Sequence, residues 1–240
     1  MATLGAPAAV LGLLGGEVLL ARQGPRLAPP AGGYPSEGDT TAVWLGDSTA
    51  LGLGTARVED SVASRVGRAR GERVVMLGVS GATAEEVLAG QLGGVAAKHP
   101  EVVYVSVGAN DVTHLSSAGD FRRSYRRLLD ALVDLEGVRV VVLGVPDMGA
   151  PPRLAQPLRA LAGFRGRQLD DVIRGEARRH AGVTYVDIAG PTGSPFRRQP
   201  KRYFSADRYH PGAAGYRLWA QAVLATPAAT PADKPTASGS

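Results

Sequence analysis

Short runs of β-branched and other apolar residues alternate along the chain with longer stretches in which apolar residues recur every three or four positions. The short runs predict strands, at residues 42–45, 73–77, 102–107, 138–145 and 183–187. The longer stretches predict helices, at residues 58–70, 84–94, 121–135, 158–179 and 211–225. Strands and helices that alternate in this way predict an α/β fold in which helices cover both faces of a parallel sheet.

Two of the predicted strands contain almost no polar residue. Residues 102–105 read Val-Val-Tyr-Val and residues 140–143 read Val-Val-Val-Leu, which is typical of strands buried on both faces. In sheets of this kind, ligands bind beyond the carboxyl ends of the strands. Polar motifs that directly follow strands are therefore the first candidates for a functional site.

Three polar motifs follow strands, and a fourth lies in a loop that we expect to return to the same edge. They are Gly46-Asp47-Ser48, Gly78-Val79-Ser80-Gly81, Gly108-Ala109-Asn110-Asp111, and Asp207 with His210. Each motif alone is also typical of a turn or a helix cap. Together they supply a serine, a histidine three residues after a carboxylate, and donors for an oxyanion, which are the groups that acyl transfer requires.

Ser48 is the candidate nucleophile. A serine hydroxyl is a weak nucleophile at neutral pH and needs a base within hydrogen-bond reach, so we expect His210 to lie beside it. Asp207 is expected to accept a hydrogen bond from the ring nitrogen that faces away from the substrate. We interpret Asp47, Asp111 and Asp147 as loop carboxylates, and the other three histidines as surface or structural residues.

The order and surroundings of the four motifs resemble the SGNH subgroup of the GDSL esterase and lipase family, from about Ala42 to about Leu224. The resemblance implies a flavodoxin-like, three-layer α/β/α fold with a parallel five-stranded sheet. It implies that carboxylic esters are cleaved through an acyl-Ser48 intermediate, with Asp207 and His210 as catalytic partners. It also implies an oxyanion hole formed by the backbone N–H groups of Ser48 and Gly81 and the side-chain amide of Asn110, with no cofactor and no metal.

Other functions stay open at this point. The same intermediate serves an acyltransferase or a deacetylase that acts on a sugar or lipid alcohol, and a non-catalytic domain would bind a carbohydrate or a lipid in the same cleft. A nucleotide-binding loop at residues 52–54 is disfavoured, because the segment does not continue as G-x-G-x-x-G and lacks the lysine of a P-loop. The expected partner is a small-molecule, lipid or carbohydrate ester.

Composition narrows the picture further. The 240 residues, 44% of them hydrophobic and 20% charged, suit one soluble-type domain, which we place at residues 41–225. The net charge of +5 comes without a nucleic-acid motif, so no nucleic-acid partner is expected. The absence of cysteine excludes disulfides, thiolate metal sites and a cysteine nucleophile, and leaves export open. We interpret the Arg-rich segment 196–204 as a solvated loop that borders the cleft, with a basic rim that favours anionic substrates or an anionic membrane surface as the alternative. The sequence does not indicate an oligomeric state.

The two ends of the chain differ from the middle. Residues 2–21 are almost wholly apolar or small, interrupted by Glu17, and we predict a membrane anchor at residues 1–22, with an amphipathic or buried helix as the alternative. Arg22 and Arg26 follow, so the positive-inside tendency predicts a membrane-associated protein whose domain faces the cytoplasm. Residues 23–40 are predicted to form a Pro/Gly-rich linker, and residues 226–240 a disordered tail.

Overall fold

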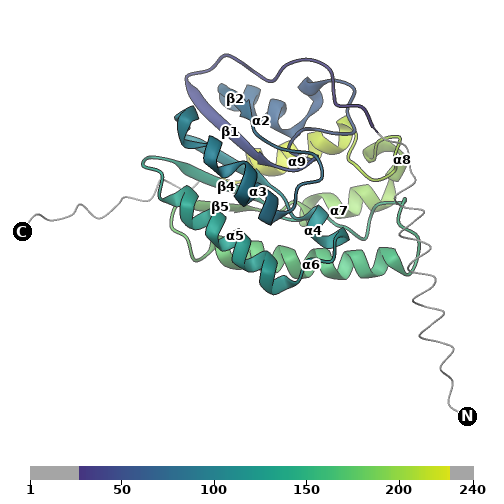
Figure 1. Cartoon of the computed structure of the whole chain (residues 1–240). Helices are drawn as coiled ribbons and strands as arrows, with labels where there is room; N and C mark the ends of the chain where they lie inside the picture. Colours follow the sequence, from purple (N-terminus) through teal and green to yellow (C-terminus); the bar gives the residue numbers. More distant parts are fainter. Residues whose placement is uncertain (1–26, 228–240) are drawn as a thin grey trace, which may run out of the picture.

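Five strands form one parallel sheet in the computed structural model, which describes residues 27–227. Their order is β2-β1-β3-β4-β5 (Figure 1), and their bounds are β1 (Thr40–Gly46), β2 (Glu72–Met76), β3 (Val102–Ser106), β4 (Arg139–Leu143) and β5 (Val183–Val186). This is the strand order of flavodoxin-like folds, and it confirms the predicted fold. The predicted anchor at residues 1–22, and the tail at 226–240 beyond its first two residues, lie outside the described residues.

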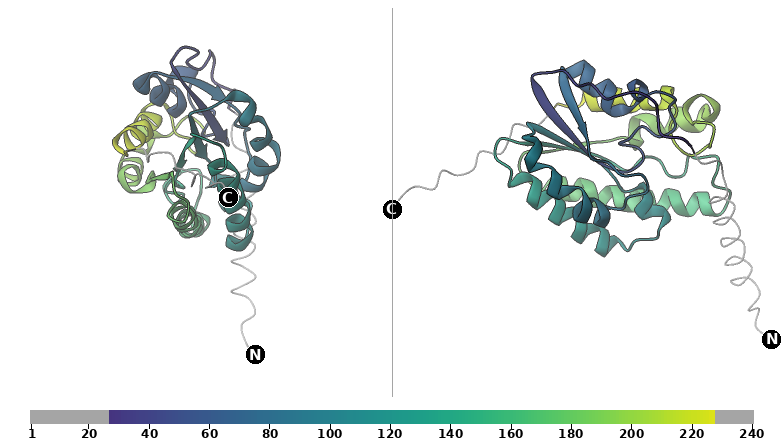
Figure 2. Two further views of the ribbon diagram at one scale, coloured as in Figure 1. Left: turned by 90° about the vertical axis from the view of Figure 1, so that its left-hand side faces the viewer. Right: turned by 45° about the horizontal axis from the view of Figure 1, so that its top comes forward.

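Helices cover both faces of the sheet and give three layers (Figure 2). One face is covered by α3 (Ala84–Gly90), α5 (Ala118–Val133) and α6 (Leu158–Ala177). The other face is covered by α2 (Val62–Arg70), α7 (Ala189–Arg198) and α9 (Ala213–Ala225). Two short helices, α4 (Ala109–Thr113) and α8 (Pro200–Tyr203), lie at the end of the domain where the carboxyl ends of the strands emerge (Figure 1).

Two apolar cores lie on the two faces of the sheet. Because successive strand residues point to opposite faces, Val43 and Val103 enter one core while Trp44 and Tyr104 enter the other. The rings of Trp44 and Tyr104 stack with centroids 4.3 Å apart. Burial on both faces explains the continuous apolar runs in the sequence.

Part of the Pro/Gly-rich segment packs against the domain. Ala31 forms an isolated parallel bridge with Arg57, the Tyr34 hydroxyl donates to the Leu51 carbonyl at 3.0 Å, and the Val74 N–H donates to the Pro35 carbonyl at 2.7 Å. None of the helices within residues 27–227 has the length and apolar character needed to cross a membrane.

The prediction of a loop at residues 196–204 is wrong, whereas its four cations are exposed to solvent as predicted. The segment contains the end of α7, Gln199, all of α8 and Phe204, and both Phe196 and Phe204 are buried. Pro195 lies inside α7, and because glycines and arginines surround the apolar residues, the sequence here lacks the apolar spacing of a helix. The segment is helical because its two phenylalanines pack on the core, which outweighs a weak intrinsic helix preference.

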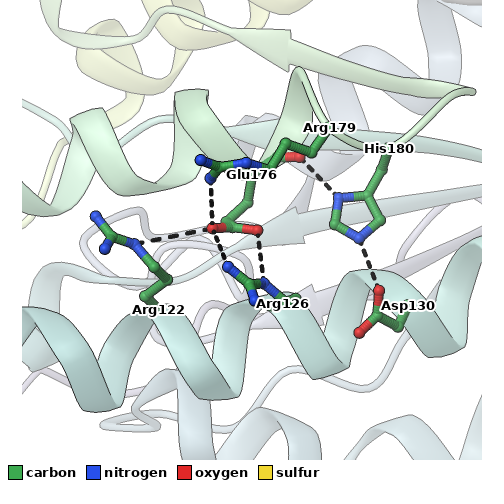
Figure 3. A network of polar contacts seen from close by, with 6 residues as sticks. All are labelled: Arg122, Arg126, Asp130, Glu176, Arg179 and His180. Carbon is green, nitrogen blue, oxygen red and sulfur yellow. Dashed lines mark hydrogen bonds and ion pairs between the residues drawn. The ribbon is translucent and has the colours of Figure 1, made fainter.

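A buried carboxylate joins α5 to α6. The side chain of Glu176 on α6 is fully buried and forms ion pairs with Arg122, Arg126 and Arg179 at 3.8, 3.2 and 3.0 Å (Figure 3). His180 bridges the same two helices, because Nδ1 lies 2.7 Å from the Glu176 carbonyl oxygen and Nε2 lies 2.9 Å from Asp130. His180 is therefore structural, as predicted.

We expect Glu176→Gln to lower the free energy of unfolding by about 1–3 kcal/mol, the usual cost of losing a hydrogen bond to a charged group. The three arginines are half-exposed, so water can hydrate their guanidinium groups in the variant. The loss of stability is therefore smaller than the loss caused by leaving a buried charge without a partner. Urea unfolding at neutral pH measures the change. Glu136→Gln, a substitution of an exposed glutamate after α5, is the control, and equal stability of the two variants would contradict the assignment.

Candidate active site

The backbone of the first motif, Gly46-Asp47-Ser48, is held at the end of β1 by the side chain of Gln91, the residue that follows α3. The Gln91 amide donates to the Gly46 carbonyl at 2.8 Å and accepts from the Gly46 N–H at 2.8 Å. Asp47 and Ser48 follow, and the Asp47 N–H donates to the carbonyl of Ser106 at the end of β3. These bonds fix the backbone immediately before Ser48. Nothing in the sequence around Gln91 indicates this role.

The structure brings Ser48, His210 and Asp207 together, although 162 positions separate Ser48 from His210. The Ser48 Oγ lies 3.1 Å from His210 Nε2, and His210 Nδ1 lies 2.6 Å from Asp207 Oδ2. The loop between Phe204 and Pro211, which an isolated bridge closes, carries both the histidine and the aspartate to the sheet edge. The hydroxyl, imidazole and carboxylate form one continuous chain of contacts.

Asp207 is buried and surrounded by donors. Its Oδ1 accepts hydrogen bonds from the Ser205 hydroxyl and from the N–H groups of Tyr209 and His210, at 2.6, 2.9 and 3.0 Å. Burial by itself raises the pKa of the Asp207 carboxyl, but the hydrogen bonds from His210, Ser205 and Tyr209 outweigh it and hold the pKa well below its usual range. The carboxyl is therefore ionised throughout the physiological pH range.

Arg153 is a cation close to Asp207. Its guanidinium lies 3.9 Å from Asp207 Oδ2, and the backbone N–H of Arg153 donates to the carbonyl of Arg208 at 3.1 Å. The loop after β4 is thereby attached to the loop that carries His210. Arg153 has no signal in the sequence, because its place in a proline-rich loop gives no sign of a contact 54 positions away.

The backbone N–H groups of Ser48 and Gly81 have no hydrogen-bond acceptor within residues 27–227. Gly81 has a φ of +86°, and a β-carbon added there would meet open space. The Asn110 amide lies at the start of α4 and donates to Asp47 Oδ2 at 3.3 Å and to the Ala82 carbonyl at 3.1 Å. Two donors are therefore free, and the third is held in place by neighbouring acceptors.

Asp47 and Asp111 support these loops, as predicted. Asp47 Oδ1 accepts from the N–H and the hydroxyl of Thr49 at 2.8 and 2.7 Å, and Asp111 accepts from the Ala84 N–H at 3.0 Å. Burial raises the pKa of each carboxyl to about 6, although hydrogen bonds partly oppose the effect. Both carboxyls therefore titrate in the folded protein near pH 6.

The raised pKa of Asp47 predicts a pH dependence of stability. Between about pH 4 and 6 the folded state holds a proton that the unfolded chain has lost, so stability contributed by this group is present at low pH and falls as pH rises through 6. We expect Asp47→Asn to remove about 3 kcal/mol of this decline, because a pKa raised from 3.8 to about 6 corresponds to that free energy. Urea unfolding at acid and neutral pH checks it, and an identical pH dependence in the variant and the wild type would contradict the assignment.

A largely apolar pocket that opens to solvent adjoins Ser48 and His210. Its polar side includes Asn110 and Asp147, and its apolar side is formed by Met148, Ala150, Pro151, Phe196, Phe204 and Trp219. Asp147 forms a two-bond ion pair with Arg197, at 2.5 and 2.9 Å. His114 does not line this pocket and is exposed. The pocket can hold an apolar group next to the serine hydroxyl.

The glycines at residues 52–54 have a packing role. Gly54 has a φ of +106°, and a β-carbon there would approach the Pro211 carbonyl oxygen to 2.3 Å. The segment thus lets the loop that carries His210 approach Ser48 closely. Within the described part of the chain, no group of three or more His, Asp or Glu side chains is arranged to hold a metal ion.

Known proteins resemble this chain in sequence. A model of the GDSL-like Lipase/Acylhydrolase family matches residues 44–218. The GDSL-like esterase Rv1075c of Mycobacterium tuberculosis is 35% identical over 196 residues, which cover 78% of this chain and 61% of that protein's length.

Two solved structures resemble the fold. One is a catalytic mutant of the acetylxylan esterase Axe2 from Geobacillus stearothermophilus, with a TM-score of 0.59, 21% identity, and coverage of 78% of this chain and 94% of the other. The second is phospholipase A1 from Streptomyces albidoflavus, with a TM-score of 0.58, 21% identity, and coverage of 78% and 99%. The family match extends over most of the domain and confirms the resemblance seen in the four motifs. The chain belongs to the GDSL-like lipase/acylhydrolase family.

Proposed function

We propose that this protein hydrolyses carboxylic esters through an acyl-Ser48 intermediate, without a cofactor. The observation that carries the proposal is the continuous contact from Ser48 through His210 to Asp207, 3.1 and 2.6 Å long, at the mouth of an apolar pocket. The esterase relative from Mycobacterium tuberculosis supports the same reaction class.

The reaction follows from the protonation of the histidine ring. With a proton on Nδ1, His210 donates to the ionised Asp207, and Nε2 accepts the Ser48 proton as Oγ attacks the ester carbonyl. The imidazolium then gives this proton to the departing alcohol oxygen, and the C–O bond of the ester breaks. Water attacks the acyl-Ser48 carbonyl by the same route, releases the carboxylic acid and restores the serine.

The negative charge on the carbonyl oxygen needs donors that are oriented before the reaction. The free N–H groups of Ser48 and Gly81 are suited to this role. The Asn110 amide is the third donor in our proposal. It has to share or exchange one of its bonds to Asp47 and Ala82, and its attachment to both acceptors keeps it close to the serine.

The apolar pocket is proposed to hold the acyl group. Its lining includes the buried side chains of Phe196, Phe204 and Trp219, and these offer no partner for a charge. An acyl chain that ends in a carboxylate would lose its hydration there, which costs several kcal/mol. Apolar acyl groups are therefore the expected substrates.

The test compares p-nitrophenyl hexanoate with mono-p-nitrophenyl adipate, which has the same number of acyl carbons and adds a terminal carboxylate. We expect kcat/KM for the hexanoate to be at least about tenfold higher, because tenfold corresponds to only about 1.4 kcal/mol. The spontaneous rate of each ester, measured with Ser48→Ala, is subtracted. Equal rates, or a preference for the adipate, would contradict an apolar acyl pocket.

A further inference from the structure

The active-site end of the domain carries most of its exposed large apolar side chains. Within residues 27–227 these are Val79, Leu115, Leu161, Phe164 and Leu224, with exposed fractions of 57, 63, 38, 58 and 40%. Val79 and Leu115 lie in loops beyond the carboxyl ends of β2 and β3, and Leu161 and Phe164 lie in the first two turns of α6, beyond the carboxyl end of β4. Ser48 and His210 lie at the same end. Single exposed apolar residues are ordinary, but a group of them beside an active site marks an interaction surface.

Three of these side chains stand on two neighbouring segments, and we call them the apolar rim: Leu115, Leu161 and Phe164. Leu161 and Phe164 are three positions apart on α6 and therefore share a helix face. The Arg165 guanidinium donates to the Ser116 carbonyl at 2.6 Å, which holds the chain after α4 against the start of α6 (Figure 1). None of the three lines the pocket beside Ser48, so the proposed catalytic reaction does not account for their exposure.

Positive charge predominates in the segments that follow β4 at this end. Between residues 145 and 212, the exposed cations here are Arg167 on α6, which also carries two of the rim side chains, and Arg197, Arg198, Lys201, Arg202 and Arg208 in α7, α8 and the loop that carries His210. Arg197 pairs with Asp147, and the exposed Asp120 near Leu115 pairs with Arg123. The exposed carboxylates of the same segment are Asp171 and Asp187. Arg167 follows Phe164 by three positions on α6, and Arg208 lies two positions before His210. Exposed apolar side chains bordered by cations match a surface with an apolar interior and anionic headgroups.

The chain also joins the domain at this end. Ala31 and Tyr34 contact Arg57 and Leu51, in the loop that begins directly after Ser48. The apolar stretch at residues 2–21 precedes them in the sequence. A covalent connection at the active-site end is compatible with a domain that presents this end to a membrane.

We propose that the apolar rim docks on an anionic lipid surface, with Leu115, Leu161 and Phe164 entering the interface and the neighbouring arginines and lysine contacting headgroups. Docking brings the pocket beside Ser48 to the lipid phase. The substrates would then be esters located in the lipid or at its surface. This part of the proposal rests on the proposed function. The docking itself requires no turnover and is measured separately.

The test is sedimentation of the full chain with vesicles of phosphatidylcholine, alone or mixed with phosphatidylglycerol. The double variant Leu161→Ser with Phe164→Ser is expected to need at least about tenfold more mixed lipid for half-maximal binding, because two apolar side chains no longer leave water. Leu224→Ser makes the same chemical change on α9, outside the active-site end, and is expected to bind like the wild type. The wild type is expected to bind pure phosphatidylcholine more weakly than the mixed vesicles.

Three results would overturn the proposal: no binding of the wild type to mixed vesicles, equal binding of the wild type and the double variant, or equal binding to both kinds of vesicle. Hydrolysis of p-nitrophenyl hexanoate without vesicles is measured in parallel and is expected to be the same for all three proteins. A wild type that binds vesicles but hydrolyses no ester counts against the proposed function and leaves the docking surface intact.

Discussion

Ser48→Ala is expected to lower kcat/KM on p-nitrophenyl hexanoate by at least about 10³-fold. The alanine leaves no oxygen 3.1 Å from His210 Nε2, so no acyl-enzyme forms. The residual rate comes from binding and from the free N–H groups of Ser48 and Gly81 acting on a water molecule. The serine side chain is small, and its Oγ hydrogen-bonds only with His210 within the described residues. The variant is therefore expected to fold normally.

Ser194→Ala is the matched control for this variant. Ser194 is exposed on α7 beside the pocket-lining Gly193, and its side chain makes no hydrogen bond within residues 27–227. Its activity is expected to equal that of the wild type. A Ser48→Ala enzyme that keeps more than about a tenth of wild-type kcat/KM would rule out the acyl-serine route.

Asp207→Asn is expected to lower kcat by about 10⁴-fold, the loss that follows when the histidine adopts the wrong tautomer. The asparagine oxygen can keep the three hydrogen bonds from Ser205, Tyr209 and His210 that Asp207 Oδ1 accepts. Its amide nitrogen then replaces Oδ2 and faces His210 Nδ1 as a donor. The proton of the His210 ring must then be on Nε2. A protonated Nε2 can no longer accept the proton of Ser48.

The same substitution is expected to lower stability at neutral pH. The depressed pKa of Asp207 means that its ionised form stabilises the fold above the pKa of the unfolded chain, and that this contribution is lost as pH falls through the folded pKa. Circular dichroism and kcat are therefore measured on the same sample. Asp187→Asn, which changes an exposed carboxylate, is the control, and a folded Asp207→Asn enzyme within tenfold of wild-type kcat would contradict the assigned role.

The sheet and the catalytic loops could be predicted from the sequence because their signals are local. Each strand is a run of apolar residues, and the observed strands begin and end within about two residues of the predicted ones. Ser48, Asn110 and His210 stand in short motifs whose order along the chain is typical of the family. The parallel topology then brings the ends of neighbouring strands to one edge.

Other parts of the site have no local signal. Gln91 fixes the end of β1 from 45 positions away, and Arg153 contacts Asp207 from the loop after β4. Neither position carries a recognisable motif, because each contact depends on how the loops pack. The predicted helix at residues 58–70 also differs in detail: a short turn ends at Asp60, and Ser61 then caps α2 by accepting from the Ser64 N–H. Ser61 lies within a stretch whose apolar residues have helical spacing, so the sequence pattern does not show that the helix is interrupted there.

The most direct test of the account is to find which residue becomes covalently attached to an acyl-like inhibitor. A fluorophosphonate loses fluoride when a serine oxygen attacks its phosphorus, and mass spectrometry then locates the adduct after digestion with trypsin. We expect a single adduct on Ser48, in the peptide of residues 27–57, much slower labelling of Asp207→Asn, and none at this peptide in Ser48→Ala. An enzyme that hydrolyses p-nitrophenyl hexanoate but is labelled at a different residue, or is not labelled at all, would contradict Ser48 as the nucleophile.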